Sequence, residues 1–393
     1  MPEAVANPAD YILAADHPLR RVGRLGLVIG VIALALLAYG AMATPTQFYR
    51  SYLVAYLYFI GIALGSLLIL MIQHVTGGPW GVRIRRTLEA GTRTLPLLAL
   101  LFVPIVFGIH DLFEWSHADV VATDEILQHK SAYLNEQFFI VRAAIYFAIW
   151  LTLTFLLSRW SKEQDVRGHT PSLGRRTLML SRGGILLYAL TITFASVDWA
   201  MSLEPHWFST MYGVLFAGGQ VLSAMAFAIA ISARLVDRAP VANVIGITCF
   251  HDLGKLLLAF VMLWAYFAFS QFLIIWAGNL PEEIPWYLNR LEGGWQYFAV
   301  AIMLFHFALP FASLLSRRLK QNARKLAILA VFVLLVRFVD TYWMITPAFS
   351  PKDLAPHWQD LAAFLGVGGI WLATFVWQLQ RRPLLPVHDP ELA

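Results

Sequence analysis

The stretch YLVAYLYFIGIALGSLLILMIQ, residues 52–73, decides the fold class of this chain. It holds no charged residue, and as an α-helix rising about 1.5 Å per residue it can cross a hydrocarbon core of roughly 30 Å. Its apolar residues are continuous, whereas the strands of a membrane barrel alternate apolar and polar positions. The stretch therefore predicts a transmembrane α-helix.

The composition of the whole chain agrees with a membrane protein. Of its 393 residues, 59% are hydrophobic and 13% are charged, whereas soluble domains carry roughly 25% charged residues. Fourteen Trp and fourteen Tyr residues suit the two membrane–water interfaces. The pI is about 9.3, but the basic residues are spread through short connections. This spread favours a topology signal over nucleic-acid binding.

Ten apolar segments are long enough to be spans, which predicts an all-α integral membrane protein. A polar segment, 1–24, precedes the transmembrane domain, 25–380, and a short tail, 381–393, follows it. The polar start lacks the apolar core of a cleaved signal peptide, so the first span is expected to be permanent. Pro96 and Pro104 predict a kink in the third span. The predicted spans are 25–42, 52–73, 94–109, 138–158, 184–200, 211–233, 254–276, 295–316, 326–345 and 361–380.

Basic residues predict how the spans are oriented. Arg and Lys concentrate in alternate connections, as in the arginine-rich run 83–93 between the second and third spans, and beside both termini. The other connections are acidic and hold few basic residues: Arg50, Lys130, Arg290 and Lys352. Because basic loops stay in the cytoplasm, both termini are predicted to be cytoplasmic. The long outer connection, 110–137, is either a solvated loop or a place where a partner docks.

The residue types argue against a complete catalytic site within the chain. Cys249 is the single cysteine, so the chain cannot form an internal disulfide, a Cys-ligated iron–sulfur cluster or a CxxCH haem attachment. We found no Gly-rich phosphate loop, nucleophile elbow or HExxH motif. No catalytic residue, metal site, metal-ligated cofactor or covalently bound cofactor is therefore predicted.

Charged residues within the spans require a reason, because ionisable groups are costly in hydrocarbon. Arg337 and Asp340 lie three residues apart on one face of the ninth span, and His306 has a similar depth in the eighth. The ion pair either locks two helices together or belongs to a proton or quinone site. His306 is either a hydrogen-bonded core histidine or a proton relay.

Two further groups of charged residues lie near the membrane faces. His251, Asp252 and Lys255 in the sequence HDLGK open the seventh span, either as a helix start with a snorkelling lysine or as a proton entry. Asp198 ends the fifth span within SVDWAMSLEPHWFST, residues 196–210, a turn rich in interfacial aromatics. Arg142 and Asp111 are expected at the same outer face.

Two long stretches resemble one known family. These are FASVDWAMSLEPHWFSTMYGVLFAGGQVLSA, 194–224, and HDLGKLLLAFVMLWAYFAFSQFLIIWAGNLPEEIPWYLNR, 251–290. Both are similar to the NrfD-like (polysulfide reductase membrane subunit-like) proteins of bacterial alternative complex III, and most similar to its ActF subunit. The resemblance implies two four-helix bundles, spans two to five and six to nine, flanked by two outer helices.

The resemblance also implies a function. Such a subunit belongs to a quinol:cytochrome c oxidoreductase of the cytoplasmic (inner) membrane. Its expected partners are a sister NrfD-like quinol-binding subunit, an iron–sulfur subunit, c-type haem subunits and membrane lipid. Menaquinone or ubiquinone is a candidate ligand. The ActF-like member is expected to aid proton translocation.

The candidate proton path follows the three groups of charged residues. It would lead from His251, Asp252 and Lys255 through His306, Arg337 and Asp340 to Asp198, Arg142 and Asp111. Two alternatives remain open, a proton-coupled secondary transporter and a purely structural anchor of the complex. Transporters often have broken helices at matching positions of two halves, and the third span has no clear counterpart.

Overall fold

The computed structural model describes residues 8–237, 241–354 and 356–392, and all regular structure in these ranges is helical. Ten of the helical segments are long and apolar enough to cross a membrane. The predicted all-α architecture with ten spans is therefore confirmed. Residues 1–7 of the predicted N-terminal segment and residue 393 of the tail lie outside the described residues.

Most helices extend beyond the apolar segments from which they were predicted, because they continue into polar flanks. The third, fifth, eighth and ninth spans are each built from consecutive helices. In chain order the spans are α1 (Pro18–Ala43), α2 (Pro45–Thr76), α3 to α5 (Pro79–Thr92, Leu95–Leu100 and Val103–Phe107), α9 (Glu136–Arg167), α10 with η3 (Pro171–Trp199 and Met201–Leu203), α11 (Tyr212–Leu235), α13 (Ile247–Gly278), α15 with η4 and α16 (Trp295–Ile302, Met303–Ala308 and Leu309–Leu315), α18 with η5 (Ala323–Ile345 and Thr346–Ala348) and α19 (Trp358–Leu379).

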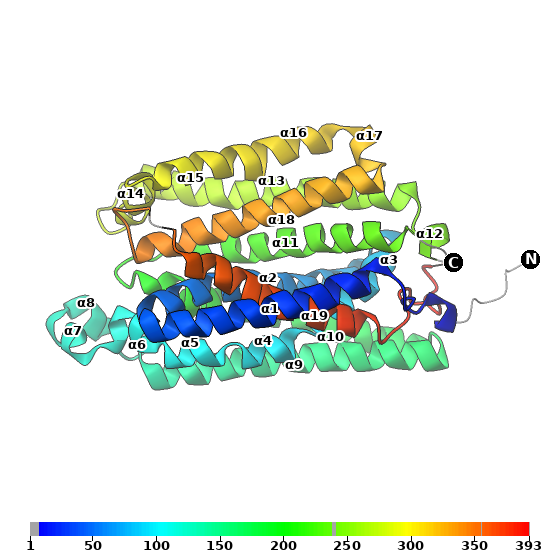
Figure 1. The fold of residues 1–393 in the computed structure, drawn as a ribbon, viewed down its shortest axis with the longest axis horizontal. Helices are drawn as coiled ribbons and strands as arrows, with labels where there is room; N and C mark the ends of the chain where they lie inside the picture. Colours follow the sequence, from blue (N-terminus) through cyan, green and yellow to red (C-terminus); the bar gives the residue numbers. More distant parts are fainter. Residues whose placement is uncertain (1–7, 238–240, 355, 393) are drawn as a thin grey trace, which may run out of the picture.

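The spans form two four-helix groups that run roughly parallel to the long axis of the molecule (Figure 1). The first group contains spans two to five, and the second contains spans six to nine. The most buried helices, α2 and α11, pack against each other and join the two groups. The outer helices α1 and α19 pack along each other, and α19 also packs against α2.

Glycines bring α1 and α19 into close contact. A Cβ atom at Gly30 would lie 2.7 Å from the backbone nitrogen of Ile370, and a Cβ atom at Gly369 would collide with the backbone of Gly26 and Gly30. Small residues of this kind let two membrane helices approach until their backbones touch. The close packing fixes the first helix of the chain against the last.

The third span is broken where the sequence places its prolines. Pro96 lies in the first turn of α4 and Pro104 in the first turn of α5, where a missing N–H is tolerated. Two tyrosines of α2 bind carbonyl groups in this broken region: Tyr56 Oη donates to Leu98 O over 3.0 Å, and Tyr52 Oη donates to Leu101 O over 2.7 Å. The break is therefore stabilised from the neighbouring helix, as buried backbone in a membrane requires.

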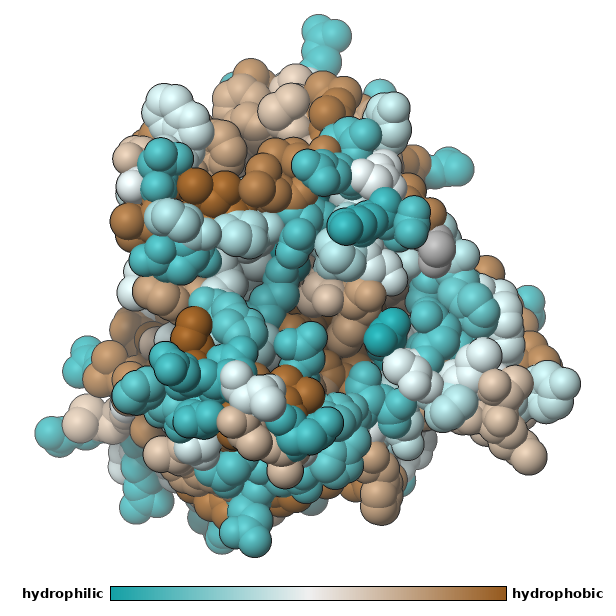
Figure 2. Space-filling model, turned by 90° about the vertical axis from the view of Figure 1, so that its left-hand side faces the viewer, coloured by the Kyte–Doolittle hydropathy of each residue, from teal (hydrophilic) through white to brown (hydrophobic). Residues whose placement is uncertain are grey.

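The described ends of the chain, η1 (Pro8–Tyr11) and the tail that follows α19, lie at one end of the bundle, which we call the terminal end (Figure 1). The opposite end, which we call the distal end, carries the short helices α6 (Ile109–Leu112), α7 (Ala118–Thr123), α8 (Glu125–Lys130) and α14 (Pro285–Leu291). Figure 2 shows the distal end face-on, with hydrophilic residues gathered over its middle. An even number of spans accounts for the shared side of the termini.

Candidate functional site

Three charged or titratable side chains expected at mid-depth lie together in the second four-helix group. Arg337 and Asp340 form an ion pair on one face of α18. Nε2 of His306, on η4, lies 3.9 Å from Oδ2 of Asp340. Each residue exposes no more than 4% of its surface. Removing an ion pair from water costs several kcal/mol of free energy per ion. Burial of this cluster therefore opposes folding unless its internal contacts offset the cost.

The surroundings of His306 leave its ring without hydrogen bonds. Neither Nδ1 nor Nε2 has a partner among the described residues, although the side chain is completely buried. The ring of Trp264 lies edge to face against it, with the centroids 4.2 Å apart. Buried polar groups are almost always paired, so an unpaired histidine ring is unusual.

A π-helical turn presents His306. Residues Met303–Ala308 form this turn, and Pro310 follows it. Pro310 has no N–H to donate to the carbonyl of His306, its usual partner in an α-helix. Such π-turns occur frequently at functional sites. The sequence signal for the turn is the pair His306 and Pro310, four residues apart.

Arg142 and Asp198 form a second buried pair, between α9 and α10. The guanidinium binds the carboxylate through two hydrogen bonds, Nε to Oδ2 over 2.8 Å and Nη2 to Oδ1 over 2.9 Å. Tyr146 Oη donates to the same carboxylate over 2.8 Å, and Arg142 Nη1 donates to Tyr133 O over 2.7 Å. Because the pair is held by two parallel charge-assisted hydrogen bonds, and each partner has a further hydrogen bond, this pair fits a structural lock.

Asp111 does not join that pair. Its carboxylate accepts a 2.6 Å hydrogen bond from Oγ1 of Thr46 at the start of α2. The residue lies in α6 at the distal end, near the same end of the bundle as Arg142 and Asp198, but no hydrogen bond or ion pair between described residues joins it to them. The three residues expected at the outer face therefore form two separate contacts.

The SVDWAMSLEPHWFST turn also attaches to other parts of the distal end. Glu204 Oε2 pairs with Nη2 of the buried Arg290 over 2.7 Å. His206 Nε2 lies 2.6 Å from Oδ2 of Asp124, which caps α8. Hydrogen bonds from the backbone N–H of Leu127 and from His206 hold the pKa of Asp124 below its ordinary value. The turn thus holds α8 and α14 in place.

The HDLGK residues lie at the surface of the terminal end. Lys255 Nζ contacts Oδ1 of Asp252 over 3.0 Å, and the two side chains are 57% and 36% exposed. Asp252 and Trp264 are about 18 Å apart along α13, at about 1.5 Å per residue. Among the described residues, no chain of hydrogen bonds connects the HDLGK side chains with the central cluster. A proton path between these groups would require water.

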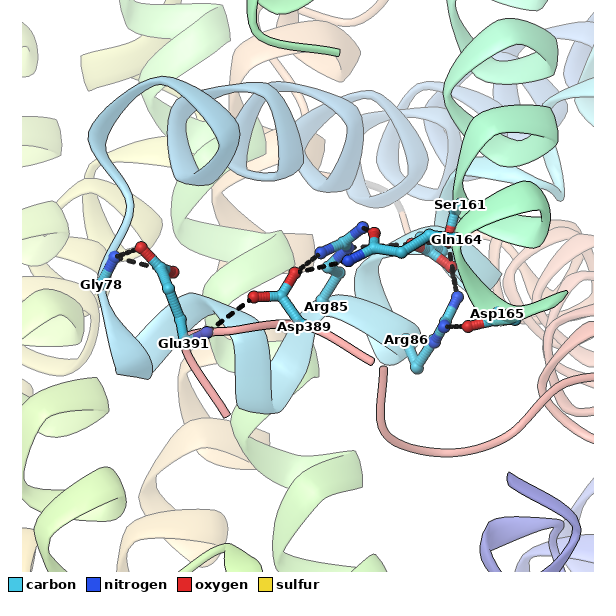
Figure 3. A network of polar contacts seen from close by, with 9 residues as sticks. Gly78, Arg85, Arg86, Ser161, Gln164, Asp165, Asp389 and Glu391 are labelled. Atoms are coloured by element: carbon cyan, nitrogen blue, oxygen red, sulfur yellow. Dashed lines mark hydrogen bonds and ion pairs between the residues drawn. The ribbon is translucent and has the colours of Figure 1, made fainter. Parts of the chain in front are cut away.

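The largest charged network was missed by the sequence analysis. Arg85 and Arg86, expected in a polar connection, lie instead in α3 and are buried. Glu89, one turn further on, accepts from Arg85 Nε over 3.3 Å, from Arg86 Nη1 over 2.8 Å and from Ser161 Oγ over 2.7 Å. Arg86 also pairs with Asp165 of α9 (Figure 3). The spacings of three and four residues were the signal for this network.

The C-terminal tail completes the network (Figure 3). Asp389 accepts from Arg85 Nη1 over 2.5 Å and from Gln164 Nε2 over 3.1 Å. The carboxylate of Glu391 accepts from the backbone N–H of Gly78, at a turn where the backbone is left-handed. The tail therefore lies over the terminal end of the first four-helix group.

Among the described residues, no group of three or more His, Cys, Asp or Glu side chains could hold a metal ion. No protein-family model matches the sequence, and no curated protein matches it. The geometry of the charged clusters, together with the resemblance in the two quoted stretches, is therefore the basis for a functional proposal.

Proposed function

We propose that this chain is a membrane subunit of a bacterial respiratory complex that oxidises quinol, and that it carries protons through its second four-helix group. The observation that carries the proposal is the unpaired, fully buried His306, with Nε2 3.9 Å from the carboxylate of Asp340. A histidine that has no structural hydrogen bond, beside a carboxylate in hydrocarbon, can exchange a proton with it.

The resemblance to the NrfD-like subunits supports the rest of the proposal. The chain would assemble with a sister quinol-binding subunit, an iron–sulfur subunit and c-type haem subunits, and would hold no redox centre itself. It would lie in the cytoplasmic membrane with the terminal end toward the cytoplasm. Quinol oxidation in the partner would change the charge balance at Arg337 and Asp340. Two discrete arrangements of that cluster are required to move protons.

The arrangement of interrupted helices favours this proposal over a secondary transporter. The span that is interrupted within its length is the second span of the first group and the third span of the second group, whereas the fourth span of each group only ends in a short 3-10 turn. Transporters built from repeats tend to break helices at corresponding positions of both halves. Co-purification with iron–sulfur and multihaem subunits distinguishes the two functions directly.

The deciding experiment measures protons taken up per quinol oxidised by the assembled complex in sealed vesicles. Asp340→Asn keeps an oxygen beside Arg337 and removes the titratable group. We expect quinol oxidation to continue with fewer protons translocated. Asp252→Asn is expected to slow proton uptake from the terminal end. Glu163→Gln, which removes a partly buried carboxylate paired with the exposed Arg167 on the other four-helix group, is the control and should change neither.

The result also tests the anchor alternative. If the complex assembles, and both Asp340→Asn and Asp252→Asn retain the original rate and stoichiometry, the proton role is rejected. The chain would then be an anchor whose buried ion pairs are structural.

A further inference from the structure

The guanidinium group of Arg337 lies directly against the backbone of α11. A Cβ atom built on Gly219 would lie 2.6 Å from Nε of Arg337 and closer still to its Cζ and Nη2. Heavy atoms that are not bonded do not approach so closely, so any side chain at residue 219 would push the guanidinium away. Nη1 of the same guanidinium binds the carboxylate of Asp340. The charged end of Arg337 therefore lies between its ion-pair partner and a glycine of a second helix.

This contact limits the positions that the guanidinium can take. Arginine side chains have much rotamer freedom, and their planar donors bind a carboxylate only from favourable directions. Asp340 lies on the same helix as Arg337, so their ion pair does not by itself relate the guanidinium to any other helix. The contact with Gly219 does so, because it relates the charged group to α11.

The residue that follows Gly219 is held by the first four-helix group. Tyr188 Oη of α10 donates to Oε1 of Gln220 over 2.7 Å. Gly65 of α2 lies so close that a Cβ atom there would collide with the backbone carbonyl of Gln220 and would lie 2.9 Å from Cβ of Ala224. Gln220 and Tyr188 are both buried. This part of α11 is therefore fixed to α2 and α10.

A tyrosine of α2 also contacts α18 on both sides of Arg337. Tyr58 Oη donates to the carbonyl oxygen of Leu334 over 2.9 Å. The ring of Tyr58 lies edge to face against Phe338, with the centroids 5.5 Å apart. Leu334 lies about one helical turn before Arg337, and Phe338 follows it directly. The first four-helix group therefore contacts both of the helices between which the guanidinium lies.

Helix packing alone does not explain a glycine at residue 219. Gly30 lies against the backbone of α19, where a small residue lets two backbones approach. The atoms nearest to Gly219 belong instead to the end of a long charged side chain. Such a side chain can adopt another rotamer, whereas a backbone cannot move away in this manner. Glycine is thus required at residue 219 only if Arg337 must keep its present position.

We propose that Gly219 is a positioning residue for the central ion pair, and that the first four-helix group holds it in place through Gln220. Gly219 leaves room for the guanidinium of Arg337 beside Asp340, and Gln220 anchors this part of α11 to α10 and α2. A movement of α2 or α10 relative to α18 would change the space beside the guanidinium. The inference rests on the proposed function only in that it concerns the cluster to which proton transfer is assigned there.

The first test measures the steric relationship by thermal unfolding of the intact complex in detergent. Gly219→Ala should lower the unfolding temperature by at least about 2 °C, because its methyl group displaces the guanidinium. The same change is then made in a background in which Arg337→Leu and Asp340→Leu replace the ion pair with apolar side chains, an exchange that buried pairs often tolerate. There the alanine should be neutral or raise the temperature, since leucine ends before the colliding atoms and alanine is favoured in helices.

The second test measures protons translocated per quinol oxidised by the complex in sealed vesicles. In Gly219→Ala the ratio should fall toward the value of Asp340→Asn, while quinol oxidation in the partner continues. A loss of stability alone would reduce the amount of active complex and leave the ratio unchanged. Gly218→Ala is the matched control, because its Cβ atom would lie 2.8 Å from Cδ2 of Phe267 on α13 and not beside a charged group. It should keep the original ratio.

Equal losses of unfolding temperature from Gly219→Ala in the two backgrounds would overturn the proposal. An original proton ratio in Gly219→Ala, where Asp340→Asn lowers it, would also overturn it, as would an equal fall in Gly218→Ala. If Asp340→Asn itself keeps the original ratio, the proposed proton function fails. The thermal comparison then decides alone whether Gly219 positions Arg337.

Discussion

Nε2 of His306 lies 3.9 Å from Oδ2 of Asp340, a separation too long for a hydrogen bond and short enough for a small shift or one water molecule to close. Arg337 already binds that carboxylate. His306 therefore adds no direct hydrogen bond to the fold in this arrangement. The relationship separates the two readings of His306 left open by the sequence, because a core histidine would be hydrogen-bonded.

Replacing His306 tests this reading through stability. His306→Leu removes a buried, unpaired polar side chain, which costs about 1–3 kcal/mol in the folded state. We expect thermal unfolding of the variant in detergent to occur at the same or a higher temperature, while proton translocation is lost. The comparison is Tyr188→Phe, which removes the 2.7 Å hydrogen bond from Tyr188 Oη to Oε1 of Gln220 and should destabilise the protein. Clear destabilisation by His306→Leu would contradict the reading.

The buried ion pair Arg142–Asp198 and the exposed ion pair Lys255–Asp252 should differ greatly in their contribution to the free energy of unfolding. Asp198→Ala leaves the Arg142 guanidinium buried without its carboxylate, which costs about 3–5 kcal/mol. Lys255→Ala breaks an exposed pair and should cost less than about 1 kcal/mol. Thermal unfolding of both variants measures the difference. Similar losses in the two variants would show that Arg142 and Asp198 are not a structural lock.

Glycine substitutions test the packing of α1 against α19. Gly30→Ala places a methyl group 2.7 Å from the backbone nitrogen of Ile370, and overpacking of this kind costs about 1–3 kcal/mol. Gly183→Ala is the matched control, because no atom beyond the local backbone of α10 lies within 4 Å of its Cβ position. Alanine is preferred over glycine in a helix by about 1 kcal/mol, so the control should be neutral or stabilising. Equal effects in the two variants would contradict the close packing.

Hydropathy was sufficient to predict the ten spans, because each buries its backbone hydrogen bonds internally and needs only length and apolar character. It failed at α3. Arg85, Arg86 and Glu89 lower the local hydropathy, yet they enter the bundle because they neutralise one another. An average over a window of residues does not detect such pairing, whereas the spacing along a helix would have indicated it.

The central cluster could be predicted because two of its members are three residues apart in one helix. The position of His306 beside Asp340 depends on how the eighth span packs against α18. Hydropathy and spacing do not specify that contact. The same limit applies to the tail, since the contact between Asp389 and Arg85 joins residues that are distant in the chain. The contact between Gly219 and Arg337 also arises from packing between helices.

The attachment of the C-terminal tail should depend on pH. Burial alone would raise the pKa of Asp389, but the Arg85 guanidinium and hydrogen bonds from Glu391 and Gln164 outweigh it and hold the pKa below its ordinary value. A carboxylate with a lowered pKa stabilises the attached state fully above the ordinary Asp value of about 3.9, and the contribution is lost as the pH falls through the lowered pKa. The tail should therefore remain attached from neutral pH down to about pH 4 and detach below it.

Limited proteolysis of the tail measures this attachment between neutral and acidic pH, with an acid-active protease at the lower end. In the original chain, cleavage after residue 383 should increase only in the most acidic samples. The Asn side chain in Asp389→Asn is uncharged at every pH. The tail of this variant should therefore be cleaved readily at neutral pH, with little further change on acidification. Asp353→Asn, a change at the distal side of the molecule, controls for the general effect of removing a carboxylate and should follow the original chain. Identical cleavage profiles for Asp389→Asn and the original chain would show that Arg85 does not hold the tail through Asp389.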